Sequence, residues 1–321
     1  MTTHDRREFL LGSLSLGALA LGACRRETYY GVGREPGPDS AAKLQKKSAK
    51  KLLFPISLAQ WSLHDALFKK TLDPLDFPIV AKRDYGIDAV EYVSTFYKEK
   101  KHDDAYFAEL AKRCAGLGVE SRLIMIDGEG NLGAAKKEER EQAVQNHVRW
   151  LEIAHALGCM AIRVNAYGEG TPEEHRDRVA ESMHALGVRG DTLGLYVIIE
   201  NHGGLSSNGA WMASVMKAAN HPRVGTLPDF GNFTIGEGQQ YDRYEGVREM
   251  MPWARAVSAK SYDFDAQGNE TTIDYARMMK IVLDAGFHAH VGIEYEGSRL
   301  SEADGIRATK ALLERLRVEL A

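Results

Sequence analysis

Short runs of β-branched and apolar residues alternate with longer segments of helical spacing from about residue 52 onward. The runs begin roughly 28 to 41 residues apart, which is the spacing expected of repeated strand–helix units. We therefore predict a strand within each run. The runs are LFPISLAQ (53–60), GIDAVEYV (86–93), VESRLIMI (119–126), MAIRVNA (160–166), LYVIIE (195–200), RVGTLPD (223–229), ARAVSAK (254–260) and HVGIEYE (290–296).

The segments between the runs carry apolar residues on one helical side. In EEREQAVQNHVRWLEIAHALG (138–158) charged residues occupy the opposite side. The closing segment, SEADGIRATKALLERLRVEL (301–320), begins with Ser301, which is a predicted N-cap. The apolar positions of the 138–158 segment are Val144, Val148, Leu151 and Ile153.

Alternating strands and helices predict a parallel sheet covered by helices. Eight such units predict a closed (β/α)8 TIM barrel over residues 52–321. The rival fold is an open doubly wound sheet, which usually shows a glycine fingerprint in its first turn. The first turn here is SLAQWSLHDALF (57–68), which contains no glycine, so the barrel is favoured.

The composition argues against nucleic-acid binding and against a disulfide-rich fold. The chain has 321 residues, is 44% hydrophobic and 27% charged, and has a net charge of −4. An acidic balance with no basic stripe argues against a nucleic-acid partner. The three cysteines form neither a disulfide framework nor a CxxC metal site. They are Cys24, Cys114 and Cys159.

The N-terminal region is predicted to lie outside the barrel. Residues 1–24 place Arg6 and Arg7 before a short apolar run, a pattern typical of a twin-arginine export signal. The run ends in LGAC, which predicts lipidation of Cys24; the alternative is a cleaved signal with an unmodified cysteine. Residues 25–51 are rich in Gly, Pro, Ser and Lys and predict a flexible linker. The expected location is periplasmic, either free or anchored by a lipid.

Polar residues follow the predicted strands, and in this barrel the carboxyl ends of the strands meet at one mouth. Glu200, Asp229 and Glu294 come from the fifth, sixth and eighth strands. Carboxylates that share a cavity repel one another, and a hard divalent cation would relieve that repulsion. Alternatively, Glu200 forms an ion pair with Arg163 or Lys260, and Asp229 is a turn former.

Other residues near the strand ends extend this hypothesis. His202 follows Glu200 closely and is a candidate metal ligand, a hydrogen-bond partner of a metal ligand, a substrate contact or a loop residue. His64 and Glu91 follow or end the first two strands and are candidate substrate contacts. Trp61 and Tyr92 are candidate wall residues of a sugar pocket or core residues.

With these strand ends in place, the chain resembles the sugar phosphate isomerase/epimerase superfamily, the xylose isomerase-like TIM barrels, over roughly residues 54–318. The resemblance rests on the order of IENHGG, PDFGNF, VSAKSYDF and GIEYEG on strands five to eight. It implies a divalent metal (Mn, Mg, Co or Zn) held by Glu200, Asp229 and Glu294. Related DNA-repair endonucleases use a histidine-rich zinc site, and that set of histidines is missing here.

Two residues depart from the family pattern. Ser258 stands where the family has a metal-binding His two positions before a Lys, here Lys260. Asn232 stands where the family often has another His, and we expect it to contact substrate instead. Serine is a poor ligand for a divalent transition metal. The site is therefore expected to hold Mg or Mn more weakly, to recruit His202, or to hold no metal.

The resemblance implies an isomerase or epimerase acting on a sugar or polyol. Glu200 and Glu294 would act as acid and base around an enediolate, and Lys260 would polarise the carbonyl group. The alternative for Lys260 is an ion pair with Glu294 or Asp229. The residues expected to hydrogen-bond substrate hydroxyls are Arg163, Asn165 and Asn201.

Two other functions stay open. A keto-glycoside lyase or hydratase would use the same residues, because elimination also begins with proton removal beside a carbonyl group. A tethered sugar-binding protein would keep a degenerate site. Export favours a free sugar over a phosphorylated one, and related barrels imply a homo-oligomer.

Overall fold

The computed structural model describes residues 52–321, so the expectations for residues 1–24, residues 25–51 and Cys24 lie outside the described part. Seven of the eight predicted runs contain an observed strand, and the eighth strand, β9, extends one residue beyond its run at 254–260. The strands are β1 (Ile56–Ala59), β2 (Ala89–Val93), β3 (Glu120–Met125), β4 (Ala161–Val164), β5 (Tyr196–Glu200), β6 (Val224–Leu227), β9 (Val257–Ser261) and β10 (Val291–Tyr295).

The eight strands form one parallel sheet that closes on itself. Their order is β6-β5-β4-β3-β2-β1-β10-β9. Parallel bridges from Thr226 to Ala254 and from Asp229 to Ser258 then join the two outer strands of this order. The predicted (β/α)8 barrel is confirmed, and the doubly wound alternative is wrong.

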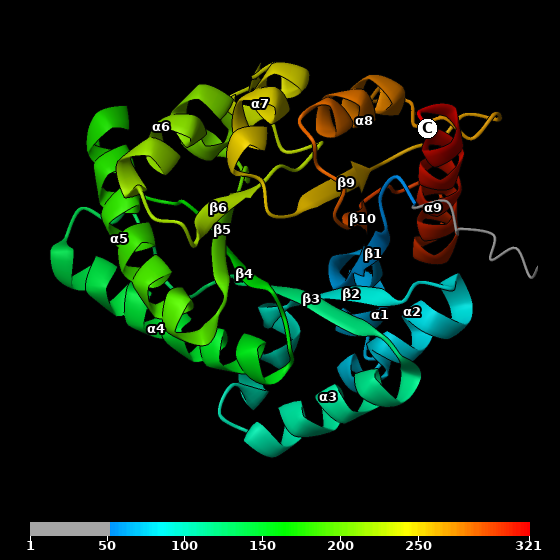
Figure 1. Cartoon of the computed structure of the whole chain (residues 1–321), viewed down its shortest axis with the longest axis horizontal. Coiled ribbons are helices and arrows are strands. Elements are labelled where there is room, and N and C mark those ends of the chain that lie inside the picture. The colour runs from blue at the N-terminus through cyan, green and yellow to red at the C-terminus, as the bar shows by residue number, and fades with distance from the viewer. Residues whose placement is uncertain (1–51) are drawn as a thin grey trace, which may run out of the picture. The chain divides into compact units, whose positions relative to one another are not determined.

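Helices surround the strands in the described residues (Figure 1). The predicted helix at 138–158 is α4, and Ser301 caps α9 because its side chain accepts a hydrogen bond from the N–H of Asp304. The helices are α1 (His64–Phe68), α2 (Phe77–Tyr85), α3 (Asp104–Leu117), α4 (Lys137–Ala156), α5 (Pro172–Leu193), α6 (Gly209–Ala219), α7 (Arg243–Met250), α8 (Tyr275–Asp284) and α9 (Glu302–Glu319).

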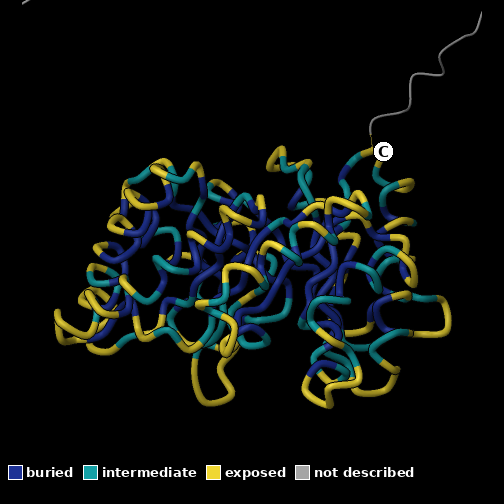
Figure 2. The backbone as a smooth tube through the Cα atoms, turned by 90° about the horizontal axis from the view of Figure 1, so that it is seen from below, coloured by how far each residue is buried: buried dark blue, intermediate teal, exposed yellow. Residues whose placement is uncertain are grey.

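Buried residues lie along the strands and the inner sides of the helices (Figure 2). The larger apolar cluster fills the layer between strands and helices. A second cluster fills the barrel interior below the mouth, so the barrel is a packed support and not a pore. This interior cluster consists of Ala59, Val93, Leu123, Met125, Ala161, Ile198, Leu227 and Ala256.

One antiparallel hairpin follows β6. It consists of β7 (Thr234–Gly236) and β8 (Gln239–Gln240), and the sequence TIGEGQQ did not predict it. Both strands are short and largely exposed, so they lack the apolar run by which the barrel strands were found. Among the helices of residues 52–321, none has the length and apolar character needed to cross a bilayer.

Candidate active site

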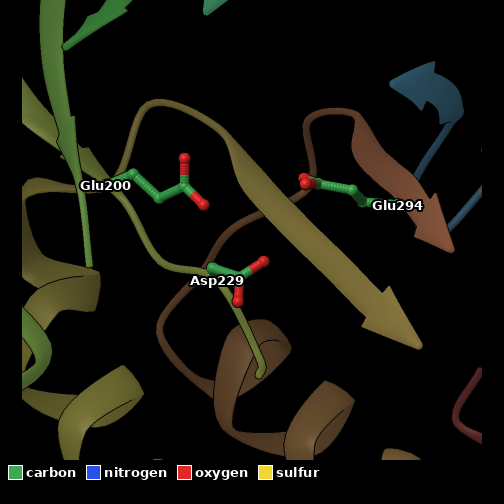
Figure 3. Close-up of side chains that lie close together, drawn as sticks. All are labelled: Glu200, Asp229 and Glu294. Atoms are coloured by element: carbon green, nitrogen blue, oxygen red, sulfur yellow. The ribbon is translucent and has the colours of Figure 1, made fainter. Parts of the chain in front are cut away.

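Three carboxylates converge at the carboxyl ends of the strands. Glu200 is the last residue of β5, Asp229 follows β6, and Glu294 lies near the end of β10. One oxygen of each lies within 4.8 Å of the others, and all three residues are buried. Figure 3 shows the three side chains directed into one space from different strands. The expected convergence of these acids is therefore present.

A turn after β6 holds Asp229 in place. Its Oδ1 accepts hydrogen bonds from the N–H groups of Gly231 and Asn232, both at 2.8 Å. The predicted role of Asp229 as a turn former is thus compatible with a place in the cluster. Its Oδ2 is buried without a hydrogen-bond partner among the described residues, so this oxygen is free for a ligand.

Asn201 connects β5 to the same turn. Its Oδ1 accepts from the N–H of Asp229 at 2.7 Å, and its Nδ2 donates to the carbonyls of Asp229 and Asn232, each at 3.0 Å. Both amide hydrogens are therefore used within the protein. Asn201 was expected to contact a substrate hydroxyl, but the structure gives it a positioning role instead.

Arg163 lies between two acids on one side of the mouth. Its Nε is 2.7 Å from Oε2 of Glu200, although the two atoms are not aligned as a hydrogen bond. Its Nη1 donates to Oδ1 of Asp127 at 3.0 Å, and Nδ2 of Asn165 donates to the same oxygen at 2.7 Å. On its other oxygen, Glu200 accepts from Nδ2 of Asn232 at 3.0 Å. The ion pair between Glu200 and Arg163, weighed as an alternative above, is present.

Lys260 occupies the corresponding position on the other side. Its Nζ donates to Oε1 of Glu294 at 2.9 Å and lies 3.0 Å from Oε2 of Glu296. Ser258 donates from Oγ to the second oxygen of Glu294 at 3.0 Å. The alternative of an ion pair between Lys260 and Glu294 is therefore realised. Glu296 had no predicted role; its place two residues after Glu294 in the run at 290–296 was the available signal.

Burial and charge set the protonation of the cluster. Burial, followed by repulsion from Glu294, raises the pKa of Glu200 to about 7 against the pull of Arg163. Burial likewise raises the pKa of Asp229 to about 7. Burial also opposes ionisation of Glu294, but the charge and hydrogen bond of Lys260 bring the pKa of Glu294 below its usual value. Burial thus disfavours the charged forms of Glu200 and Asp229, and a bound cation would favour them.

The sequence matches the model of a known protein family. The family described as "Xylose isomerase-like TIM barrel" matches residues 80–317. The chain belongs to this family. No curated protein was found to match the sequence.

Solved structures of similar fold include sugar epimerases. An L-ribulose 3-epimerase is 15% identical with a TM-score of 0.65, covering 83% of this chain and 95% of its own. A xylose isomerase-like TIM barrel protein from Mycobacterium smegmatis, in complex with magnesium, is 18% identical with a TM-score of 0.63, covering 84% and 98%. A 3-keto-D-glucoside 4-epimerase from E. coli is 14% identical with a TM-score of 0.60, covering 83% and 100%. At these identities the likeness establishes the fold alone.

The three acids of this xylose isomerase-like barrel fit a divalent ion. Their oxygens are close enough to share one ion, and Oδ2 of Asp229 lacks another partner in residues 52–321. A set of oxygen ligands without imidazole suits Mg or Mn better than softer metals. Glu200, Asp229 and Glu294 would hold the ion.

His202 does not complete this set. Within the described chain, the group of residues close enough to hold a metal contains the three acids alone. Nδ1 of His202 lies instead 2.6 Å from the hydroxyl oxygen of Tyr167. In this structure the loop after β5 places His202 beside Tyr167, and its role as a metal ligand stays a prediction.

The two remaining predicted contacts lie at different depths. Glu91 is buried, accepts from Oγ of Ser57 at 2.5 Å, and packs against Gly292. Since Gly292 precedes Glu294 by two residues on β10, Glu91 lies one layer deeper than the acid cluster. His64 lies near the mouth and stacks on Trp61, with ring centroids 5.0 Å apart.

Proposed function

We propose that the protein is a sugar isomerase or epimerase that removes and returns a proton at a carbon beside a carbonyl group. The observation that carries this proposal is the convergence of Glu200, Asp229 and Glu294 in one buried space. The names of two neighbours support it. C3 of L-ribulose lies beside its C2 ketone, and C4 of a 3-keto-glucoside lies beside its C3 ketone.

Glu200, Glu294 and Lys260 can each perform one part of this proton transfer. Glu200 and Glu294 reach the shared space from different strands (Figure 3), so one can take the proton and the other can return it. Return at the same carbon gives an epimer, and return at the neighbouring carbon gives an isomer. Lys260 has three N–H donors and uses two on Glu294 and Glu296, which leaves one for the oxygen of the carbonyl group.

A divalent ion held by Glu200, Asp229 and Glu294 would supply Lewis-acid polarisation of the carbonyl oxygen. The carboxylates would then be neutralised in part by the ion and in part by Arg163 and Lys260. The magnesium complex of one neighbour supports binding of a hard ion by a barrel of this fold.

We also propose that the protein belongs to an exported subgroup. Support comes from the sequence alone: Arg6 and Arg7 precede an apolar run that ends at Cys24. Export would present the barrel mouth to free sugars outside the cytoplasm.

The test is solvent deuterium exchange with metal analysis. In D2O with Mg or Mn, wild-type protein should place deuterium beside the ketone of L-ribulose or of a 3-keto-glucoside without loss of any fragment. Glu200→Gln keeps the side-chain size but removes the charge, so exchange should fall by at least about 100-fold. Bound metal should fall in the same variant. Glu237→Gln, in the exposed hairpin, is the matched control and should change neither quantity.

Other outcomes would redirect the proposal. Release of an aglycone with an unsaturated sugar would indicate a lyase. Binding of sugar without deuterium uptake would indicate a sugar-binding protein. If wild-type protein without bound metal still incorporates deuterium, Lys260 would be the group that polarises the carbonyl.

A further inference from the structure

Four aromatic rings gather beside the acid cluster, and we call them the aromatic shelf. Trp61 stacks on His64 with an interplanar angle of 17°. Phe68 meets Trp61 and Phe96 edge-on, with ring centroids 6.0 and 5.1 Å away. The shelf consists of Trp61, His64, Phe68 and Phe96, from the segments that follow β1 and β2.

The shelf opens at the barrel mouth. Trp61 and Phe96 pack on the apolar cluster of the barrel interior, so the shelf lies over the ends of the strands. Nε1 of Trp61 donates to Oε1 of Glu296. The other oxygen of Glu296 pairs with Lys260, which in turn pairs with Glu294. A chain of direct contacts therefore runs from the shelf to the acid cluster.

The outer part of the shelf is not core packing. Phe68 is 55% exposed, although an aromatic ring of this size normally gains stability from burial. His64 keeps about a third of its side chain in solvent. Two acidic side chains lie beside these rings. Asp65 follows His64 directly and accepts from Lys69 on Oδ2, and Glu302 accepts from two backbone N–H groups with Oε1 3.7 Å from Nδ1 of His64. Each carboxylate has about four acceptor sites, so both keep capacity for a further donor. The shelf thus combines aromatic faces with hydrogen-bond acceptors at the edge.

This combination matches a pyranose ring. Such a ring presents apolar C–H groups on its face and hydroxyl donors around its rim. An aryl group would bring no hydrogen-bond donors for Asp65 and Glu302. Continuity with the acid cluster indicates that the ring belongs to the same molecule that reacts there.

We propose that the aromatic shelf binds a second sugar ring, so that the substrate is a two-ring glycoside whose first ring reaches Glu294. This inference rests on the proposed function for the identity of the reacting ring. Binding at the shelf itself requires no turnover, so the two can fail separately.

The test compares affinities for cellobiose and glucose, measured by calorimetry and by quenching of tryptophan fluorescence. Wild-type protein should bind cellobiose about tenfold more tightly than glucose, as one aromatic stacking contact of about 1.4 kcal/mol would give. Phe68→Ala should lower the affinity for cellobiose to near that for glucose and leave glucose binding unchanged. Val188→Ala, an exposed apolar position on α5, should change neither affinity.

Several results would overturn the inference. Equal affinities of wild-type protein for the two sugars would exclude a second-ring site. Tighter binding of phenyl glucoside than of cellobiose would assign the shelf to an aryl group. A change of oligomeric state in Phe68→Ala, measured by sedimentation, would assign it to contact between copies of the chain. Preferential cellobiose binding without any deuterium exchange would support the shelf and contradict the proposed reaction instead.

Discussion

At the scale of single residues, the mouth of the barrel is a set of buried polar groups that position one another. Arg163 and Lys260 are each placed between two acids, and both basic side chains are buried. Because charged groups are costly to bury, each of these contacts constrains its partners strongly. Substitutions here should therefore affect stability as well as chemistry.

Asn201 provides a direct case. Asn201→Leu keeps the approximate size but leaves the N–H and the carbonyl of Asp229 without their Asn201 partner. It also removes one of two donors to the carbonyl of Asn232, which keeps its hydrogen bond from Oγ of Ser207. The free energy of unfolding should fall by about 2 to 4 kcal/mol, measured with denaturant. Asn131→Leu, at an exposed position, is the control and should cost less than about 0.5 kcal/mol. Equal losses in the two variants would contradict the positioning role of Asn201.

Glu91 predicts a pH dependence. Burial raises the pKa of Glu91 from 4.5 to about 7. Between these values the folded protein keeps a proton that the unfolded chain has released, so stability falls as the pH rises from about 4.5 to about 7 and stays lower above it. Glu91→Gln should make the loss of unfolding free energy between pH 5 and pH 8 about 2 kcal/mol smaller than in wild type. The same pH dependence in both proteins would show that Glu91 does not titrate in this range.

The candidate acids and two of their ion pairs, Glu200 with Arg163 and Glu294 with Lys260, could be proposed from the sequence, but the contacts of Trp61 and His202 could not. Glu200, Asp229 and Glu294 end or follow apolar runs, and parallel strands bring such residues to one mouth. The contact of Trp61 with Glu296 joins residues 235 positions apart and depends on side-chain rotamers. The orientation of His202 depends in the same way on the path of a loop.

At the scale of elements, the strands were easier to predict than the packing of helices against them. A β-branched run such as LYVIIE is buried on both faces and leaves a continuous apolar signal. The hairpin after β6 leaves no such signal. Close contacts between a helix and a strand are also difficult to predict from the sequence. Some of them require a glycine at one helix position, where any side chain would collide with the strand.

Gly305 in α9 illustrates this. A Cβ atom at Gly305 would collide with the ring of Tyr295, which is buried on β10 between Glu294 and Glu296. Gly305→Ala should therefore lower the melting temperature, equivalent to about 1 to 3 kcal/mol of lost stability. Gly116→Ala in α3 is the matched control, because the added methyl group meets open space; it should stabilise by about 0.5 to 1 kcal/mol. Stabilisation by both changes would contradict close packing of α9 on β10.

At the scale of the whole molecule, the proposed export signal can be tested separately from the proposed reaction of the barrel. Replacing Arg6 and Arg7 by lysine should keep the precursor in the cytoplasm of a host with a twin-arginine system, measured by cell fractionation. Cys24→Ser should leave export intact and release the protein from the membrane fraction if Cys24 is lipidated. Metal content and deuterium exchange of the purified proteins should be the same as in wild type. Unchanged fractionation of the arginine variant would contradict the proposed route.

Asp229 has two roles: its backbone bridge to Ser258 helps to close the barrel, and its side chain belongs to the acid cluster. Oδ1 of Asp229 maintains the turn that closes the barrel, while Oδ2 is buried without a hydrogen-bond partner in residues 52–321. A relative that kept the barrel but not the proposed metal site would therefore not accept every residue at this position. Asparagine would preserve the turn without the charge, so Asn at position 229 would be the expected residue in such a relative.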